Sequence, residues 1–231
     1  MKYEKILAER PDKVIYKDGE NALKVFNSNY SKADILNEAL NQARVEETGL
    51  NIPALNQVTM IDGQWVISTK FIEGKTLAQL MDENPEKLDE YLNLFVDLQL
   101  EMNKETVPLL NKLKDKMNRK ISESGYDATT RYELHTRLES MPKHNKVCHG
   151  DFNPSNVIVG KNGKMTVVDW AHATQGNASA DAAMTYLLFA LKDQETADLY
   201  LKLFCKKSDT ARQYVQQWLP IVAAAQLTKD N

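Results

Sequence analysis

The stretch "VCHGDFNPSNVIVGKNGKMTVVDWAHA" (residues 147–173) decides the fold of this chain. Two runs rich in β-branched residues flank Asn162-Gly163, a pair suited to the positive φ angles of a type I′ turn, so the stretch predicts a β-hairpin. A hairpin holds its two ends side by side. Asn156, just before the first strand, and Asp169, just after the second, should therefore be neighbours.

Asp151 lies five residues before Asn156, on the loop that enters the hairpin. Together with Asp169 these residues would place three oxygen-bearing side chains at one end of a rigid element. Such a group suits a hard divalent cation and one catalytic carboxylate. Polar loop residues that only cap turns are the commoner case, so spacing alone leaves both interpretations open.

The order of these residues matches the phosphoryl-transfer template, in which a catalytic-loop Asp is followed after four residues by a Mg²⁺-binding Asn and, after a hairpin, by a second metal-binding Asp. The words "HGDFNPSNVIV" and "VVDW" resemble the aminoglycoside phosphotransferase and choline kinase-like superfamily. Its catalytic loop is typically His-Gly-Asp-x-x-x-x-Asn, and its metal motif is often Asp-Phe or Asp-Trp. The resemblance implies that Asp151 is the catalytic residue and that Asn156 and Asp169 bind Mg²⁺.

This resemblance implies an α+β, bilobal protein-kinase-like fold with a small antiparallel-sheet N-lobe containing one helix and a mainly helical C-lobe. The patterning agrees: strands are predicted first and helices dominate after about residue 75. We expect an N-terminal nucleotide-binding lobe at residues 1–72 and a C-terminal catalytic and acceptor-binding lobe at 73–231. The predicted strands are 5–9, 13–19, 22–26, 55–63 and 64–72, the last two joined at Asp62-Gly63, and the predicted helices are 31–49, 86–103, most of 106–140 and most of 181–226.

Two predictions concern helix faces. Helical spacing in residues 31–49 places Ile35, Ala39, Leu40 and Ala43 together. The last helical segment is expected to pack through Leu187, Leu188, Leu191, Leu199 and Leu203.

The resembled fold needs a strand lysine for the α/β-phosphates of ATP and a helix glutamate that holds the lysine. "NALKVF" supplies Lys24 on the third predicted strand, and Glu38 lies in the following helix. Taken alone, each residue is more often a solvated side chain, but their order before the catalytic motif favours the pair. Glu46 and Glu47 are weaker candidates because they lie near the helix end.

"ISTKFIEGKTL" resembles the hinge of this superfamily. The adenine would receive backbone hydrogen bonds from the segment around Lys70 to Ile72. The expected phosphate loop reads "AERPDK" and contains no glycine, and no GxxxxGK[ST] motif occurs in the chain. This departure weakens a protein-kinase interpretation more than the superfamily one, and it leaves the contacts of that loop with phosphate unpredicted.

Composition excludes several classes. With 42% hydrophobic and 26% charged residues in 231, the chain is typical of a globular protein, and a formal charge of −3 gives no reason to expect a nucleic-acid partner. Two cysteines make a disulfide framework improbable, and the charged N-terminus argues against a secretory signal. No apolar run reaches the roughly 20 residues of a membrane helix. We therefore expect a cytoplasmic protein without membrane or nucleic-acid partners.

Only eleven residues separate Asp169 from Asp181, and no Ala-Pro-Glu-like motif follows, so the platform on which protein kinases dock peptides is missing. The sequence thus predicts an ATP- and Mg²⁺-dependent phosphotransferase with a small-molecule hydroxyl acceptor, such as an antibiotic, an amino alcohol or a sugar-like molecule. A non-catalytic nucleotide-binding regulatory protein and, less favoured, a protein kinase are the alternatives. The acceptor, the preference for ATP over GTP and the oligomeric state are not predicted.

Overall fold

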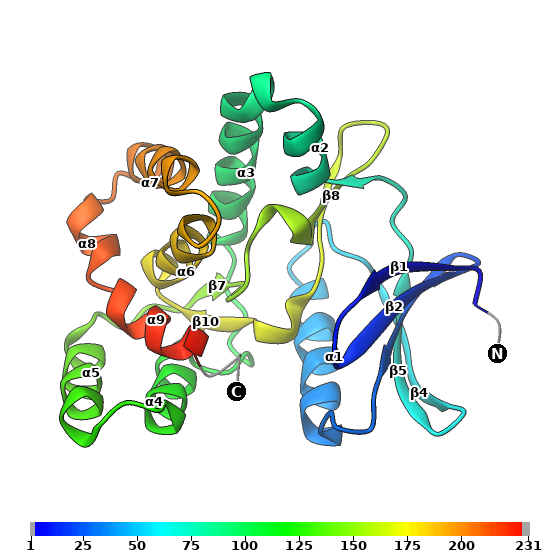
Figure 1. Cartoon of the computed structure of the whole chain (residues 1–231), viewed down its shortest axis with the longest axis horizontal. Helices are drawn as coiled ribbons and strands as arrows, with labels where there is room; N and C mark the ends of the chain where they lie inside the picture. Colours follow the sequence, from blue (N-terminus) through cyan, green and yellow to red (C-terminus); the bar gives the residue numbers. More distant parts are fainter. Residues whose placement is uncertain (1–2, 228–231) are drawn as a thin grey trace. The chain divides into compact units, whose positions relative to one another are not determined.

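An antiparallel sheet forms the start of the chain in the computed structural model, which describes residues 3–227 (Figure 1). Within the described residues it has five strands in the order β1-β2-β3-β5-β4. Asp62 and Gly63 between the last two strands have φ angles of 50° and 81°, the positive values of a type I′ turn, so the predicted tight hairpin is confirmed. The strands are β1 (Lys5–Glu9), β2 (Lys13–Asp18), β3 (Asn21–Phe26), β4 (Leu55–Ile61) and β5 (Gln64–Lys70).

Helix α1 (Lys32–Glu46) packs on this sheet. It begins where expected, because the Ser31 hydroxyl accepts a hydrogen bond from the Asp34 N–H at 3.1 Å. Ile35 and Ala39 enter a buried cluster with strand residues, as their spacing predicts. Leu40, at the same helical spacing, is 46% exposed and lies outside this cluster.

The hairpin predicted from residues 147–173 is present as β8 (Val157–Val159) and β9 (Met165–Val167). Its turn is not the predicted type I′. Gly163 has a φ of 76°, Asn162 is not in the positive-φ region, and the Gly163 N–H donates to the Gly160 carbonyl at 2.8 Å. The hairpin therefore has a longer loop closed by a left-handed glycine, which relieves Asn162 of any need for positive φ.

A two-residue strand, β6 (Lys75–Thr76), pairs with β8. Directly before it, Gly74 lies so close to β8 that a Cβ atom at this position would be 2.3 Å from the Val159 carbonyl oxygen. The glycine of the "EGKT" segment is thus required by this strand contact.

The described residues form two compact units. The first comprises the chain up to Leu80 together with Ser155–His172, and the second comprises Met81–Pro154 together with the chain from Ala173 onward. The β8–β9 hairpin belongs to the first unit. Asn51 contacts it there, because the Asn51 carbonyl accepts a hydrogen bond from the Val167 N–H at 3.1 Å. These two compact units are defined differently from the nucleotide-binding and catalytic lobes predicted to divide at residue 72. That functional division stays a prediction. Residues 1–2 and 228–231 of the two predicted lobes lie outside the described residues.

The second unit is mainly helical, with the short strands β7 (Lys146–Cys148) and β10 (Thr174–Gly176) paired together. Its core includes Phe95 stacked on Phe152, with ring centroids 4.3 Å apart.

Short single-turn helices occur in both units, at Pro85–Lys87, Pro154–Asn156 and Trp170–His172. The longer helices of the chain after the sheet are α2 (Leu77–Glu83), α3 (Leu88–Met102), α4 (Leu113–Glu123), α5 (Ala128–Ser140), α6 (Ala178–Ala190), α7 (Gln194–Ser208), α8 (Arg212–Gln216) and α9 (Leu219–Leu227).

The predicted leucine face of the last segment is wrong. Leu191 is 67% exposed, and the other four predicted leucines are only partly buried. Helix α6 instead buries small residues such as Ala182 and Ala183, and α7 buries Tyr200 and Phe204. A helix that is apolar on most of its sides gives no periodic signal for the face that packs, and small side chains allow the closest approach.

None of the helices among residues 3–227 is both long and apolar enough to cross a membrane.

Candidate functional site

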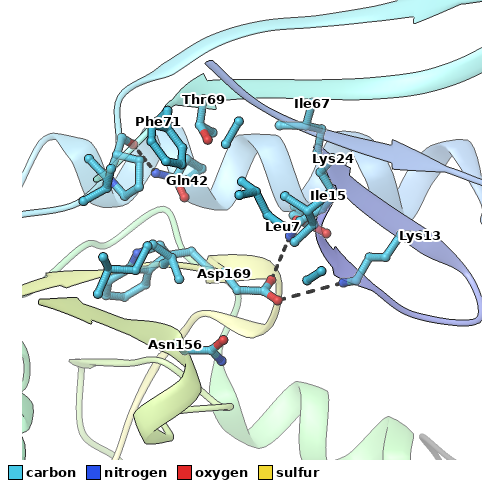
Figure 2. Close-up of a pocket in the computed structure, with 18 of the residues that line it drawn as sticks. Leu7, Lys13, Ile15, Lys24, Gln42, Ile67, Thr69, Phe71, Asn156 and Asp169 are labelled. Atoms are coloured by element: carbon cyan, nitrogen blue, oxygen red, sulfur yellow. Dashed lines mark hydrogen bonds and ion pairs between the residues drawn. The ribbon is translucent and has the colours of Figure 1, made fainter. Parts of the chain in front are cut away.

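A cavity of about 260 Å³ lies within the first unit (Figure 2). Most of its wall is apolar, whereas one end carries the ionic side chains of Lys24 and Asp169 and the amide of Asn156. The apolar lining includes Leu7, Ile15, Ala22, Ile67, Phe71, Ile72, Ile158, Val168 and Trp170. A flat apolar slot with a charged end suits a ligand with one aromatic and one anionic part.

The structure brings together the predicted pair Lys24 and Glu38 and adds Asp169. The Lys24 ammonium donates to Glu38 Oε1 and, at 3.0 Å, to Asp169 Oδ1. Burial by itself lowers the pKa of Lys24, but the negative charges of Asp169 and Glu38 more than offset this and raise the pKa above its ordinary value. The lysine is therefore a permanent cation held in a fixed position. The weaker candidate Glu46 serves another purpose, since its Oε1 accepts from the Leu55 N–H at 2.6 Å.

Asp169 has a left-handed backbone, with a φ of 65°. This region is sparsely occupied by non-glycine residues, although Asp and Asn tolerate it best. The conformation reverses the chain directly after β9 and directs the carboxylate to the charged end of the cavity (Figure 2). Such local strain is typical of sites where a side chain must be held in one direction.

Asn156 and Asp169 lie at the same end of the hairpin, as predicted. The hairpin ladder continues past its strands, because the Val168 N–H donates to the Asn156 carbonyl at 2.9 Å. Both side chains line the cavity. The hairpin thus holds an amide oxygen and a carboxylate next to each other.

These two donors fit a magnesium ion in chemical type. Burial raises the pKa of Asp169, but the charges of Lys24 and Lys13 outweigh burial and keep the pKa well below its ordinary range, so the carboxylate is ionised. Hard oxygen donors of this kind suit Mg²⁺, which usually takes one or two protein ligands and completes its shell with water and phosphate oxygens. Among residues 3–227 no group of three or more His, Cys, Asp or Glu side chains is arranged to hold a metal ion by itself.

The predicted hinge residues Lys70 and Ile72 also line the cavity. Two N–H groups of this segment are already used: the Lys70 N–H donates to the Ala54 carbonyl at 2.8 Å, and the Phe71 N–H donates to the Glu20 carbonyl at 2.8 Å. The two bonds fix the hinge backbone on both sides.

Lys13 is a cavity residue that the sequence analysis missed. Its Nζ lies 4.0 Å from Asp169 Oδ2, and its side chain is only 15% exposed. Arg10, from the same β1–β2 turn, also lines the cavity. The signal in the sequence is the pair of cations, Arg10 and Lys13, in "AERPDK", at a place where the kinase template predicts glycines.

Asp151 lies in the second unit, on the loop after β7. Gly150 has a φ of 77°, and its N–H donates to Asp181 Oδ1 at 2.7 Å. The imidazole of His149 is buried, and its Nδ1 accepts from the Asp151 N–H at 3.3 Å. Asp181 and His149 therefore each accept a hydrogen bond from the backbone of this loop, at Gly150 and at Asp151.

Asp181 is a buried carboxylate whose environment is unusual. Burial raises its pKa, and the hydrogen bond from Gly150 lowers it only in part. Oδ2 of this carboxylate has no hydrogen-bond partner within the described residues. A carboxyl group kept here in spite of that cost indicates that the position of the Gly150 backbone matters.

A buried polar chain continues the support on the other side of the loop. The Thr185 hydroxyl donates to the Phe152 carbonyl at 2.8 Å, and Gln99 Nε2 donates to the Thr185 hydroxyl at 3.4 Å. The Tyr200 hydroxyl in turn donates to Gln99 Oε1 at 2.6 Å. The side chains of Thr185, Gln99 and Tyr200 are fully buried, so each of these hydrogen bonds pairs a polar group that would otherwise have no partner.

Replacing Thr185 by valine, which has the same shape, should lower the free energy of unfolding by about 1–3 kcal/mol because the Phe152 carbonyl and the Gln99 amide lose a buried partner. Urea denaturation measures this change. Thr136→Val is the matched control, since the Thr136 hydroxyl also donates to a backbone carbonyl, that of Tyr132, but at the surface. The control should change stability by less than about 0.5 kcal/mol. Equal effects of the two variants would contradict the role given to Thr185.

Comparison with known proteins also indicates a phosphotransferase. A sequence profile of the family described as "Phosphotransferase enzyme family" matches residues 13–216. No curated protein sequence is significantly similar to the chain.

Solved structures share the fold over nearly the whole chain at low sequence identity. An aminoglycoside-3′-phosphotransferase of type VIII superimposes with a TM-score of 0.71 at 14% identity, covering 97% of this chain and 93% of that one. A thermostable mutant of aminoglycoside phosphotransferase APH(4)-Ia, in a ternary complex with ADP and hygromycin B, gives 0.71 at 13% identity and covers 98% and 85%. The choline kinase LicA from Streptococcus pneumoniae gives 0.62 at 15% identity and covers 100% and 85%. The predicted α+β fold, with an N-terminal antiparallel sheet and one helix followed by a mainly helical part, is thus confirmed.

Proposed function

The chain belongs to the phosphotransferase enzyme family, and on that premise we propose that it transfers the γ-phosphate of ATP, with Mg²⁺, to a hydroxyl group of a small molecule. The observation that carries the proposal is the position of Lys24. Its ammonium is paired with both Glu38 and Asp169 at the charged end of an apolar cavity. The same arrangement holds the nucleotide phosphates in the phosphoryl-transfer template.

The cavity residues would bind ATP along its length. The adenine would lie between apolar walls and bond to the backbone of the segment around Lys70 to Ile72, while Lys24, oriented by Glu38, would bind the phosphates. Asn156 and Asp169 would hold Mg²⁺, which when bound supplies positive charge to the β- and γ-phosphates. Because the two ionic partners fix Lys24 in advance, little reorganisation is needed when the nucleotide binds.

Asp151 would act on the acceptor. Its carboxylate would accept a hydrogen bond from the acceptor hydroxyl, orient the oxygen toward the γ-phosphorus and take the proton as the new O–P bond forms and the bond to ADP breaks. The supports from Asp181 and Thr185 fix the backbone on either side of this residue. Positioning and charge neutralisation would supply most of the rate.

A small molecule fits the acceptor role better than a protein. In the segment between Asp169 and Asp181, the structure has one single-turn helix, strand β10 and the start of α6, with no long segment that could dock a peptide. Relatives with this fold bind hygromycin B or are choline kinases by name. Aminoglycosides and amino alcohols are therefore the first acceptor classes to test, in a protein that we still expect in the cytoplasm.

An acceptor screen tests the proposal. The purified protein is incubated with ATP and Mg²⁺ and, separately, with aminoglycosides, choline, other amino alcohols and sugars, and the products are identified by mass. We expect one class to gain a single phosphoryl group with release of an equal amount of ADP, and chelation of Mg²⁺ should stop the reaction. Nucleotide binding without transfer to any acceptor would favour the non-catalytic regulatory protein, and transfer only to peptides would favour a protein kinase.

A further inference from the structure

Strand β2, directly after the β1–β2 turn, begins with a largely buried lysine, Lys13, at the place where the kinase template has a glycine-rich loop. We propose that Lys13 binds the phosphates of the nucleotide and takes over the part that backbone N–H groups of glycines play in the kinase template. The inference rests on the proposed function, because it deepens the description of the same nucleotide site. Figure 2 shows Lys13 and Lys24 pointing toward Asp169 from two different strands.

Burial is the first argument. The side chain of Lys13 is 15% exposed, close to the 13% of Lys24, although Lys13 begins a strand after a surface turn. Lysines at strand ends usually extend into water, because removing an ammonium ion from water is costly. Asp169 Oδ2, at 4.0 Å, is too far for a hydrogen bond and compensates only part of this cost. An ammonium so placed is suited to further anionic contacts.

Charge balance is the second argument. Lys13 and Lys24 together carry two positive charges, and Glu38 and Asp169 together carry two negative charges. A site of this kind is neutral by itself, so with one bound Mg²⁺ ion it carries two net positive charges toward an anionic ligand. Without Lys13 the four-residue balance would shift by one negative charge, and the site would attract phosphate less.

The rigidity of the turn is the third argument. The Arg10 N–H donates to the Lys13 carbonyl at 2.9 Å and closes the turn, and Pro11 fixes its own φ angle. Asn27, directly after β3, donates two hydrogen bonds to the turn. Its backbone N–H donates to the Asp12 carbonyl at 3.0 Å, and its Nδ2 donates to the Pro11 carbonyl at 2.9 Å. A glycine loop can close on its ligand, whereas this turn holds its lysine in place beforehand.

Two substitutions test the inference. Lys13→Met keeps the length of the side chain and removes the charge, and Lys13→Arg keeps the charge. The control is Lys161→Met, which removes an exposed lysine paired with Glu73 in the same unit. Calorimetric titration with ATP, ADP and adenosine, each with Mg²⁺, measures how far every variant distinguishes nucleotides by their phosphates.

We expect Lys13→Met to weaken the binding of ATP and ADP by about tenfold to a hundredfold, the range for loss of one hydrogen bond to a charged group. Adenosine binding should stay unchanged, Lys13→Arg should keep most of the affinity for ATP, and Lys161→Met should match the wild type. The inference is overturned if Lys13→Met binds ATP as tightly as the wild type or tighter, since Lys13 would then only neutralise Asp169. It is also overturned if adenosine and ATP weaken equally, because the effect would then be structural.

The same titrations separate this inference from the proposed function. If the wild-type protein binds ATP and transfers its phosphate, but Lys13→Met loses no affinity for ATP relative to adenosine, the proposed function stands and the role of Lys13 is wrong. A wild-type protein that binds neither ATP nor ADP removes the proposed function itself.

Discussion

Replacement of Asp151 by asparagine is expected to lower the turnover number by about 10²–10⁴-fold, the usual contribution of a positioned general base. Asparagine fills the same space but cannot take the proton of the acceptor hydroxyl. The loop should keep its shape, because its supports bond to the backbone of Gly150 and Phe152 and not to the Asp151 side chain. The affinity for ATP should change little, since the nucleotide cavity is lined by residues of the first unit.

Steady-state kinetics with the acceptor found by the screen, together with calorimetric titration of ATP, measures both quantities. Asp89→Asn, an exposed carboxylate in the first turn of α3, is the control and should behave as the wild type. An Asp151→Asn enzyme that turns over at half the wild-type rate or more would remove Asp151 from the role of base. A variant that loses ATP affinity to the same degree as turnover would indicate a folding defect instead.

The central part of the site could be predicted from the sequence because its residues lie at fixed distances from one hairpin. Asn156 and Asp169 flank two strands that pair with each other, with Val157 opposite Val167, so their proximity follows from local structure. Lys24 and Glu38 are far from the hairpin in sequence. They were found through the resemblance, which gave their order, and the structure shows their ion pair with each other and with Asp169.

Lys13 could not be predicted in the same way. The resemblance directed attention to glycines in the β1–β2 turn, and a lysine at the start of a strand is normally solvated. Its burial depends on the approach of Asp169, which lies more than 150 residues later in the chain. Only the tertiary structure brings the two side chains together, and no local pattern reports such a contact.

The predicted type I′ turn at Asn162-Gly163 and the predicted leucine face were wrong for local physical reasons. The Asn162-Gly163 pair suits two adjacent positive φ angles, yet one left-handed glycine is enough when the loop is longer, and the Gly160 carbonyl stabilises that alternative. In α6 most of the buried positions are filled by small residues (Ser179, Ala180, Ala182, Ala183 and Thr185), so Leu187 and Leu188 lie at the edges of the packed face, and Leu191, directly after the helix, lies in water. Composition favours large residues as core candidates, whereas close helix packing selects small ones.

Replacement of Asp169 by asparagine is expected to weaken strongly the tightening of ATP binding by Mg²⁺, because a neutral amide oxygen is a poorer ligand than a carboxylate. It should lower phosphoryl transfer by about a thousandfold or more, because a bound metal ion supplies several kcal/mol of charge stabilisation. Asparagine is among the few residues that tolerate a φ of 65°, so the backbone should not change. Lys24 keeps its bond to Glu38 and remains in place. Calorimetric titration of ATP with and without Mg²⁺ measures the loss directly.

Two further variants separate charge from backbone strain. Asp169→Ala removes the oxygen donor altogether and should abolish the Mg²⁺ effect. Because alanine costs about 1–2 kcal/mol in the left-handed region, this variant should also unfold at lower urea concentration than Asp169→Asn. Asp62→Asn is the matched control, because Asp62 has a φ of 50° in the β4–β5 turn of the same unit and does not line the cavity. It should retain both stability and the Mg²⁺ effect. If Asp169→Ala retains that effect as well, the carboxylate is not a metal ligand, and its pairing with Lys24 and Lys13 would have to account for its strained backbone.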